Sequence, residues 1–214
     1  MKCIYCSNTY TYELGNRQRK CSRCKRKFSP QKLKREEKLR ALFTRRANAR
    51  KASGETGMHF ATVQKYYEKF RKELALKADE QYQLNSHRVT EYDEYLYLPK
   101  SLKAEGNIDR FQHFLTLSYD ERVYNLMMPG IKRYGIHLED RQGEALLLKY
   151  LNYNKVAKLS KAQSTITEFW DYFEIFILQY RGVSDEQFVF YLKEAEWRFN
   201  ERQPLSAPER SLHR

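Results

Sequence analysis

The stretch STITEFWDYFEIFILQY, residues 164–180, decides the fold of the second half of the chain. Its large apolar side chains, among them Phe169, Trp170 and Phe173, recur at the spacing of one helix face. We therefore expect a buried aromatic helix in the core. One acid, Glu168, directly precedes the Phe-Trp pair. It is either a residue at the solvent margin of the helix or a functional carboxylate whose burial has a purpose.

The segments before this helix have the composition of strands. RVTEYDEYLYLPK predicts a strand at residues 89–98 that stops at Pro99. RFQHFLTLSYDERVYNLMMPG predicts two further strands about a turn near residues 119–121. A helix is expected at residues 138–153, and KVAKLS, residues 155–160, is a candidate for another strand.

A last helix is predicted after the aromatic one. Ser184 and Gln187 stand in capping-box positions at its start. Its apolar side chains repeat on one side, at Phe188, Leu192 and Phe199. Strands followed by helices predict an α+β domain, in which helices pack on a small antiparallel sheet.

All four cysteines lie in the first 24 residues, as CIYC (Cys3, Cys6) and CSRC (Cys21, Cys24). Two residues between thiolates let both sulfurs point at one ion, so two such turns predict a structural four-cysteine Zn²⁺ site. Gly15-Asn16 between the pairs favours a hairpin. Two disulfides are the alternative, but the chain starts without a secretion signal and such proteins fold where thiols stay reduced.

The net charge of +13 is concentrated at the N-terminus. Residues 1–77 hold 22 Lys and Arg against 6 Asp and Glu, whereas the remainder holds 18 against 21. A segment this basic has an acidic polymer as its natural partner, because each phosphate that it neutralises releases counterions. A solvated, self-repelling basic arm is the alternative.

ARKASGETGMHFATVQKYYEKFRKEL has the order of a helix-turn-helix. Small Ser53 lets two helices approach, Gly57 permits a left-handed turn, and Met58, Val63 and Tyr66 would form a small core. The second helix, near residues 60–74, would enter the major groove of double-stranded DNA. An ordinary helical hairpin with a charged face is the alternative. The base-reading candidates are His59, Ala61, Gln64 and Lys65; the phosphate-binding candidates are Arg45, Arg46, Arg50, Lys51, Lys69 and Arg71.

The composition excludes global disorder and a membrane span. Hydrophobic residues make up 41% of the chain and aromatic residues 14%, which suffices to fill a core. No apolar run approaches the roughly 18 to 20 residues that a membrane span needs. We therefore expect a soluble, cytoplasmic protein.

Taken together, these motifs resemble the bacterial insertion-sequence transposases that pair an N-terminal zinc ribbon with an RNase H-like core. The resemblance rests on the cysteine pairs, the helix-turn-helix, the DE of YDEY, the I-x-x-F-W of ITEFW, and YRGV followed by FVFYLKEAEWRFNER. It implies a nucleoid-associated enzyme that cuts and joins DNA by means of acids that bind two divalent ions, Mg²⁺ or Mn²⁺.

The resemblance also implies which acids take part. Asp93, in YDEY, takes the first position. Asp140, in LEDRQ, is the nearest candidate for the second, with Glu139 and Glu144 as rivals. In the family an acid directly follows the Ile of the last motif; in ITEFW that place holds a threonine, and Glu168 is displaced by one residue. One residue rotates a helical side chain by about 100°.

The resemblance divides the chain into modules. We expect a zinc ribbon at residues 1–30, a basic helix-turn-helix at 31–77, a linker at 78–87, an RNase H-like domain at 88–203 and a flexible tail at 204–214.

Two functions from different classes follow. The first is a DNA transposase that binds element ends and acts as a homodimer or higher oligomer, because transposition pairs two ends. The alternative is a catalytically inactive, transposase-derived DNA-binding protein or transcription regulator, and an unrelated zinc-ribbon regulator is a third possibility.

Overall fold

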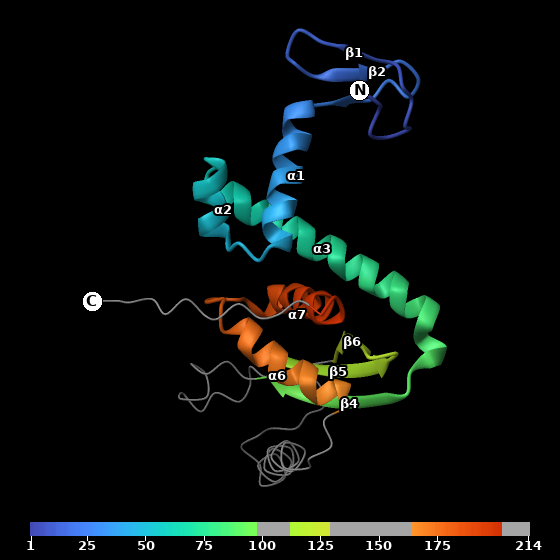
Figure 1. Cartoon of the computed structure of the whole chain (residues 1–214), viewed down its shortest axis with the longest axis vertical. Helices are drawn as coiled ribbons and strands as arrows, with labels where there is room; N and C mark the ends of the chain where they lie inside the picture. Colours follow the sequence, from blue (N-terminus) through green and yellow to red (C-terminus); the bar gives the residue numbers. More distant parts are fainter. Residues whose placement is uncertain (98–111, 129–163, 203–214) are drawn as a thin grey trace, which may run out of the picture. The chain divides into compact units, whose positions relative to one another are not determined.

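Figure 1 shows the computed structural model of the chain, which describes residues 1–97, 112–128 and 164–202. Two compact units divide it, Met1–Phe70 and Arg71–Arg214. The described residues form a mixed α+β structure with two small antiparallel sheets and five α-helices. None of the helices in these ranges combines the length and the hydrophobicity needed to cross a membrane.

The first sheet belongs to the N-terminal unit. Its strands β1 (Thr11–Glu13), β2 (Arg19–Cys21) and β3 (Lys27–Phe28) are antiparallel and adjacent in that order. The hairpin predicted between the cysteine pairs is confirmed. Its turn uses a positive φ of 60° at Arg17, and the Asn16 side chain accepts a hydrogen bond from the backbone N–H of residue 18 at 3.2 Å.

Three helices follow, α1 (Pro30–Thr44), α2 (Ala49–Thr56) and α3 (Phe60–Asn85). The side chain of Ser29 caps α1 and that of Asn48 caps α2, each by accepting a backbone N–H that the helix leaves unpaired. These caps place the helix starts in a segment rich in charge and poor in large apolar residues.

The turn between α2 and α3 has the predicted chemistry. Gly57 ends α2 in the left-handed conformation, with φ 66°. The hydroxyl of Ser53 donates to the carbonyl of Met58 at 2.6 Å, so this small residue ties the turn to α2.

The small core of these helices differs in part from the prediction. Val63 is buried, as expected, but Met58 and Tyr66 are only half-buried. Tyr67 takes the interior position instead: its ring lies 5.0 Å from that of Phe43, and its hydroxyl donates to a backbone carbonyl at 2.8 Å. On α3 the buried residues Val63, Tyr67 and Phe70 thus follow the spacing of one helix face. Leu39 and Leu42 of α1 and Ala52 of α2 complete this core.

Residues 78–87, expected to form a linker, are largely helical. α3 continues to its last residue at position 85, and a 3-10 turn, Ser86–Arg88, leads into the second sheet. The reason is packing: Ala78 and Tyr82 on α3 contact an apolar cluster of the sheet, and the Tyr82 ring stacks on that of Tyr124 with centroids 4.1 Å apart.

The second sheet consists of β4 (Glu91–Tyr97), β5 (Gln112–Tyr119) and β6 (Arg122–Met127), antiparallel in that order. Asp120 and Glu121 form a two-residue turn with φ 46° and 59°, the geometry that suits the twist of a hairpin. This confirms the predicted strands. The predicted strand ends at Pro99 and Pro129-Gly130, the helix at 138–153 and the strand at 155–160 lie outside the described residues.

Helices α6 (Thr165–Ile177) and α7 (Asp185–Asn200) complete the C-terminal unit. Ser184 begins α7, but its side chain makes no capping hydrogen bond, so the capping box predicted there is wrong. The capping box occurs at α6, where Ser164 and Thr167 exchange hydrogen bonds with each other's backbone.

The aromatic side chains of α6 form the core, as predicted. The Trp170 ring lies 4.7 Å from that of Tyr95 on β4, and its indole N–H donates to Thr116 on β5 at 2.9 Å. The remaining members come from β5, α6 and α7, and include Phe114, Phe169, Phe173, Phe188, Leu192 and Phe199.

The other side of α7 is buried as well, although it is charged. The carboxylate of Glu194 accepts from Arg71 at 2.6 Å and from Arg198 at 2.7 Å. Two residues on, and so on a different side of α7, Glu196 accepts from Lys193 at 3.0 Å. Burial lowers the pKa of Lys193 and raises that of Glu196, because both charged forms lose water.

Candidate functional site

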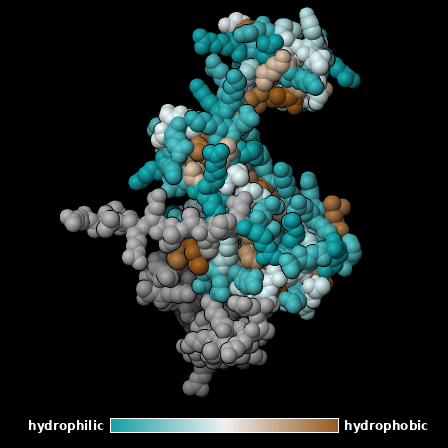
Figure 2. Space-filling model, viewed as in Figure 1, coloured by the Kyte–Doolittle hydropathy of each residue, from teal (hydrophilic) through white to brown (hydrophobic). Residues whose placement is uncertain are grey.

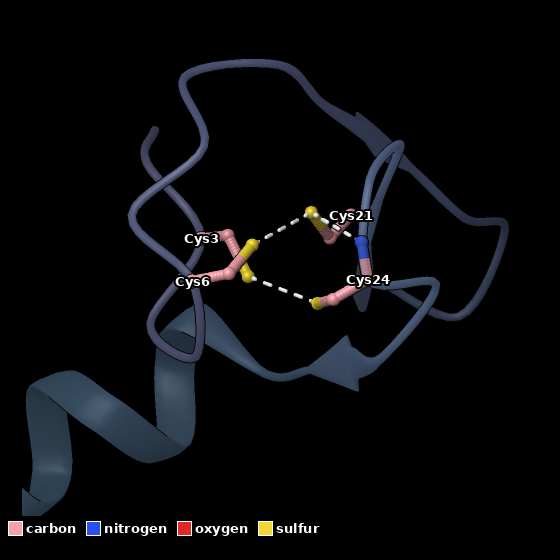
Figure 3. Close-up of side chains that lie close together, drawn as sticks. All are labelled: Cys3, Cys6, Cys21 and Cys24. Atoms are coloured by element: carbon pink, nitrogen blue, oxygen red, sulfur yellow. Dashed lines mark hydrogen bonds between the residues drawn. The ribbon is translucent and has the colours of Figure 1, made fainter.

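The four cysteines converge on one point (Figure 3). Their sulfurs all lie within 4.8 Å of one another, and the Cys3–Cys24 and Cys6–Cys21 pairs are both 3.6 Å apart. A tetrahedral Zn²⁺ with bonds of about 2.3 Å separates its sulfurs by roughly 3.8 Å. The group therefore fits a metal ion such as zinc.

Both halves of the site repeat one backbone pattern. The residue after each second cysteine, Ser7 or Lys25, has a positive φ, 56° or 60°. The backbone N–H of Cys3 donates to the carbonyl of Asn8, five residues on, at 2.8 Å, and Cys21 donates to the carbonyl of residue 26 at 3.0 Å. This repetition turns both sulfurs of each pair inward.

Hydrogen bonds differentiate the thiols. Burial would raise the pKa of Cys21, but donors from the backbone of Cys24 and Arg23 and from the Asn8 side chain bring it down to about 6. At Cys24 the Arg26 N–H lowers the pKa, but burial and the other three thiols raise it to about 11. Four neighbouring thiols cannot all ionise at neutral pH without a cation.

The positions of the four sulfurs do not fit the alternative of two disulfides. A disulfide holds its sulfurs about 2.05 Å apart. Here all four cysteines are free and the shortest of these sulfur contacts is 3.6 Å.

Asn8 is a part of the site that sequence reasoning missed. Its side-chain N–H lies 3.7 Å from the sulfur of Cys21 and 2.8 Å from the hydroxyl of Ser22, and so links the two halves. Such a support fixes a ligand in position. The sequence feature that could have identified Asn8 is its position two residues after Cys6.

The base-reading candidates share one place in the structure. His59 precedes the first turn of α3, and Ala61, Gln64 and Lys65 lie in its first two turns; all four are exposed. The buried Val63 and the residues that follow at its spacing occupy the other side of the helix. The start of α3 therefore presents polar side chains to solvent.

The phosphate-binding candidates separate into two groups. Arg45, Arg50 and Lys51 are exposed and Arg46 is half-buried, all at or near the segment between α1 and α2. The ammonium of Lys69 pairs with a carboxylate of α1 at 2.5 Å. Arg71 is buried against α7 and is therefore removed from the surface that DNA would contact.

The N-terminal unit carries the charge excess. Met1–Phe70 holds 19 Lys and Arg against 5 Asp and Glu. In Figure 2 hydrophilic residues cover most of the visible face of the described elements. The N-terminal unit is therefore strongly basic.

Two of the three acids predicted for catalysis, Asp93 and Glu168, lie in the described part of the chain. Asp93 is half-buried on β4, where burial raises its pKa although the Glu94 N–H lowers it. Glu168 is exposed in the first turn of α6, two residues and so about 200° from the buried Trp170. Asp140 lies outside the described residues, as do Glu139 and Glu144.

Within residues 1–97, 112–128 and 164–202, the four cysteines are the one group of three or more His, Cys, Asp or Glu side chains placed to hold a metal ion. The described acids therefore do not form a two-metal site by themselves.

No protein-family model matches the sequence, and no curated protein or solved structure matches it either.

Proposed function

We propose that the chain is a transposase of the zinc-ribbon insertion-sequence type whose N-terminal unit binds double-stranded DNA at the ends of an element. The observation that carries the DNA-binding role is the coincidence, in one unit, of a four-cysteine cluster, a left-handed glycine turn between two helices and an excess of 14 positive charges. The cysteine cluster acts as a structural zinc ribbon, because four protein ligands leave no open position for chemistry.

In this proposal α2 and α3 act as a helix-turn-helix. The first turns of α3 enter the major groove, where Gln64 and Lys65 reach base edges and His59 lies at the helix start. Arg45, Arg50 and Lys51 contact phosphates, which fix the register of the protein on the duplex.

The test compares two exposed lysines of the same helix. Lys65→Ala should weaken binding to a duplex selected from a random pool and reduce its salt dependence, whereas Lys77→Ala should leave both unchanged. The ammonium of Lys65 in the groove also neutralises part of the nearby phosphate charge, so its loss should reduce the slope of log K against log salt by at most about 0.9. Equal effects of the two variants would show that α3 does not dock by its N-terminal turns.

The catalytic part of the proposal rests on Asp93. It lies on the first strand of an antiparallel meander, the position that the resemblance gives to the first acid of an RNase H-like core, and it is partly shielded from water. Cleavage and strand transfer by this fold use acids that hold divalent ions. Asp140 and Glu168 remain the other candidates, and two copies of the chain would pair two element ends.

Asp93→Asn tests this directly. We expect it to abolish Mg²⁺- or Mn²⁺-dependent nicking of an element end and to leave duplex affinity unchanged. Glu94→Gln is the matched control, because Glu94 points to the other face of β4, where its carboxylate lies 3.1 Å from His113. Loss of binding together with nicking would argue against a catalytic role for Asp93.

The second candidate is an inactive, transposase-derived DNA-binding protein or regulator. The observation that favours it is the exposed position of Glu168 on α6. In that case the natural chain itself shows no nicking with either metal ion, and Asp93→Asn changes neither binding nor stability.

A further inference from the structure

The two faces of the N-terminal sheet differ in character. Side chains that stand directly opposite in an antiparallel pair share one face, and alternate residues along a strand point to opposite faces. One face carries Cys21 and Phe28, which are 0% and 5% exposed and pack around the cysteine cluster. The sheet therefore packs on the cysteine cluster with this face.

The opposite face carries a row of aromatic and basic side chains across all three strands. Lys20, on the central strand β2, is paired with Tyr12 on β1 and with Lys27 on β3. Tyr10 lies two residues before Tyr12, and its backbone carbonyl accepts from Ser22 as the hairpin opens. This row, Tyr10, Tyr12, Lys20 and Lys27, is the outer face of the sheet.

The outer face is accessible. Tyr10 is 71% exposed and Tyr12 41% exposed, and Lys27 is exposed as well. Within the described residues, none of the four side chains in the row makes a hydrogen bond, an ion pair or a ring contact. By contrast, the neighbouring Tyr5 packs its ring edge-on against that of Phe28.

This combination has a specific binding chemistry. Exposed aromatic rings beside ammonium groups on a small sheet match the needs of unpaired nucleotides, whose bases stack on rings while the phosphates pair with cations. A duplex offers no base face to such rings, because its bases are already stacked on one another. Charge complementarity to a polyanion is supplied by the whole unit, which has an excess of 14 positive charges.

We propose that the outer face of the N-terminal sheet binds single-stranded DNA, with Tyr10 and Tyr12 stacking on bases and Lys20 and Lys27 contacting the backbone. This second DNA site is distinct from the first turns of α3 in residues and in the form of DNA that it takes. It does not depend on a transposase activity, since it follows from the sheet alone.

The experiment measures binding of the full, zinc-loaded chain to two fluorescent probes, a dT oligonucleotide of about 20 nucleotides and a mixed-sequence duplex of equal length. Tyr12→Ala should weaken dT binding about ten-fold, because one stacked base is lost, and change duplex binding less than two-fold. Tyr12→Phe keeps the ring and should bind dT as the natural chain does.

Two further variants secure the interpretation. Tyr92→Ala removes a tyrosine of the other unit that is 74% exposed, close to the 71% of Tyr10, and should leave dT binding unchanged. Tyr10→Ala lies outside the strands and should reproduce the loss of dT binding if Tyr12→Ala fails to hold its zinc.

An unchanged dT affinity in both Tyr10→Ala and Tyr12→Ala would overturn the proposal, as would an equal loss of dT and duplex binding in a zinc-loaded variant. Lys65→Ala tests the duplex site separately. It should weaken duplex binding and leave dT binding unchanged.

Discussion

At the scale of single residues, the four thiols link metal binding to proton release. Cys21 ionises at about pH 6 in the metal-free site, whereas the pKa of Cys24 lies at about 11. A metal ion needs both as thiolates, so at neutral pH binding displaces the proton of Cys24 but none from Cys21. Acid therefore opposes metal binding.

This predicts a change of slope in the pH dependence of zinc affinity. Below about pH 6 Cys21 also carries a proton in the metal-free chain, so the slope of log K against pH should rise by about one unit there. Competition with a chromophoric chelator between pH 5 and pH 8 measures this. A slope of log K against pH that stays constant from pH 5 to pH 8 would contradict the hydrogen-bond pattern around Cys21.

At the scale of elements, the turn between α2 and α3 determines where the second helix begins. Gly57 has a left-handed φ of 66°, whereas Gly54, inside α2, does not. A Cβ at either position would meet no atom within 4 Å, so the two glycines differ in backbone conformation and not in the space around them.

Substituting each glycine with alanine should therefore have opposite effects. Gly57→Ala should destabilise the N-terminal unit by about 1–2 kcal/mol, because an L-residue is strained in the left-handed region. Gly54→Ala should stabilise it by about 0.5–1 kcal/mol, because alanine is the better helix former. Chemical denaturation followed by far-ultraviolet circular dichroism measures both, and effects of the same sign would be inconsistent with this turn.

The same elements show what sequence can and cannot predict. The cysteine spacing predicted the four-cysteine cluster, and the hairpins followed from turn residues, because both are local. Tyr67 was missed in favour of Tyr66, because a one-residue rotation of α3 about its axis is decided by packing against Phe43. The placement of Glu168 likewise depended on which side of α6 meets the sheet, a tertiary property.

At the scale of the whole molecule, the two units have separate sources of stability. The small N-terminal sheet has few buried apolar side chains and gathers around the cysteines, whereas the C-terminal unit has an extensive aromatic core. Metal should therefore contribute much of the folding free energy of the N-terminal sheet and none to that of the C-terminal unit.

Metal removal should distinguish the units by their intrinsic fluorescence. Trp170 and Trp197 are the two tryptophans of the chain, and both belong to the C-terminal unit. We expect EDTA to abolish dT binding by the outer face of the N-terminal sheet while leaving the tryptophan emission maximum unchanged, and added zinc to restore binding. A red shift of tryptophan emission on chelation would show that the second unit also depends on the metal.

The burial of α7 on both sides has a consequence for how this chain tolerates sequence change. The segment LKEAEWR would be chosen as a permissive surface for tags, labels or charge redesign on its composition alone. Yet Glu194 and Glu196 are each 1% exposed and Arg198 is 2% exposed, and their partners lie on α7 itself, on α3 or on β6. Removing one partner of such a buried pair typically costs about 3–5 kcal/mol. A randomised library should therefore accept fewer amino acids in the middle of this helix than at its exposed start, at residues 185–187.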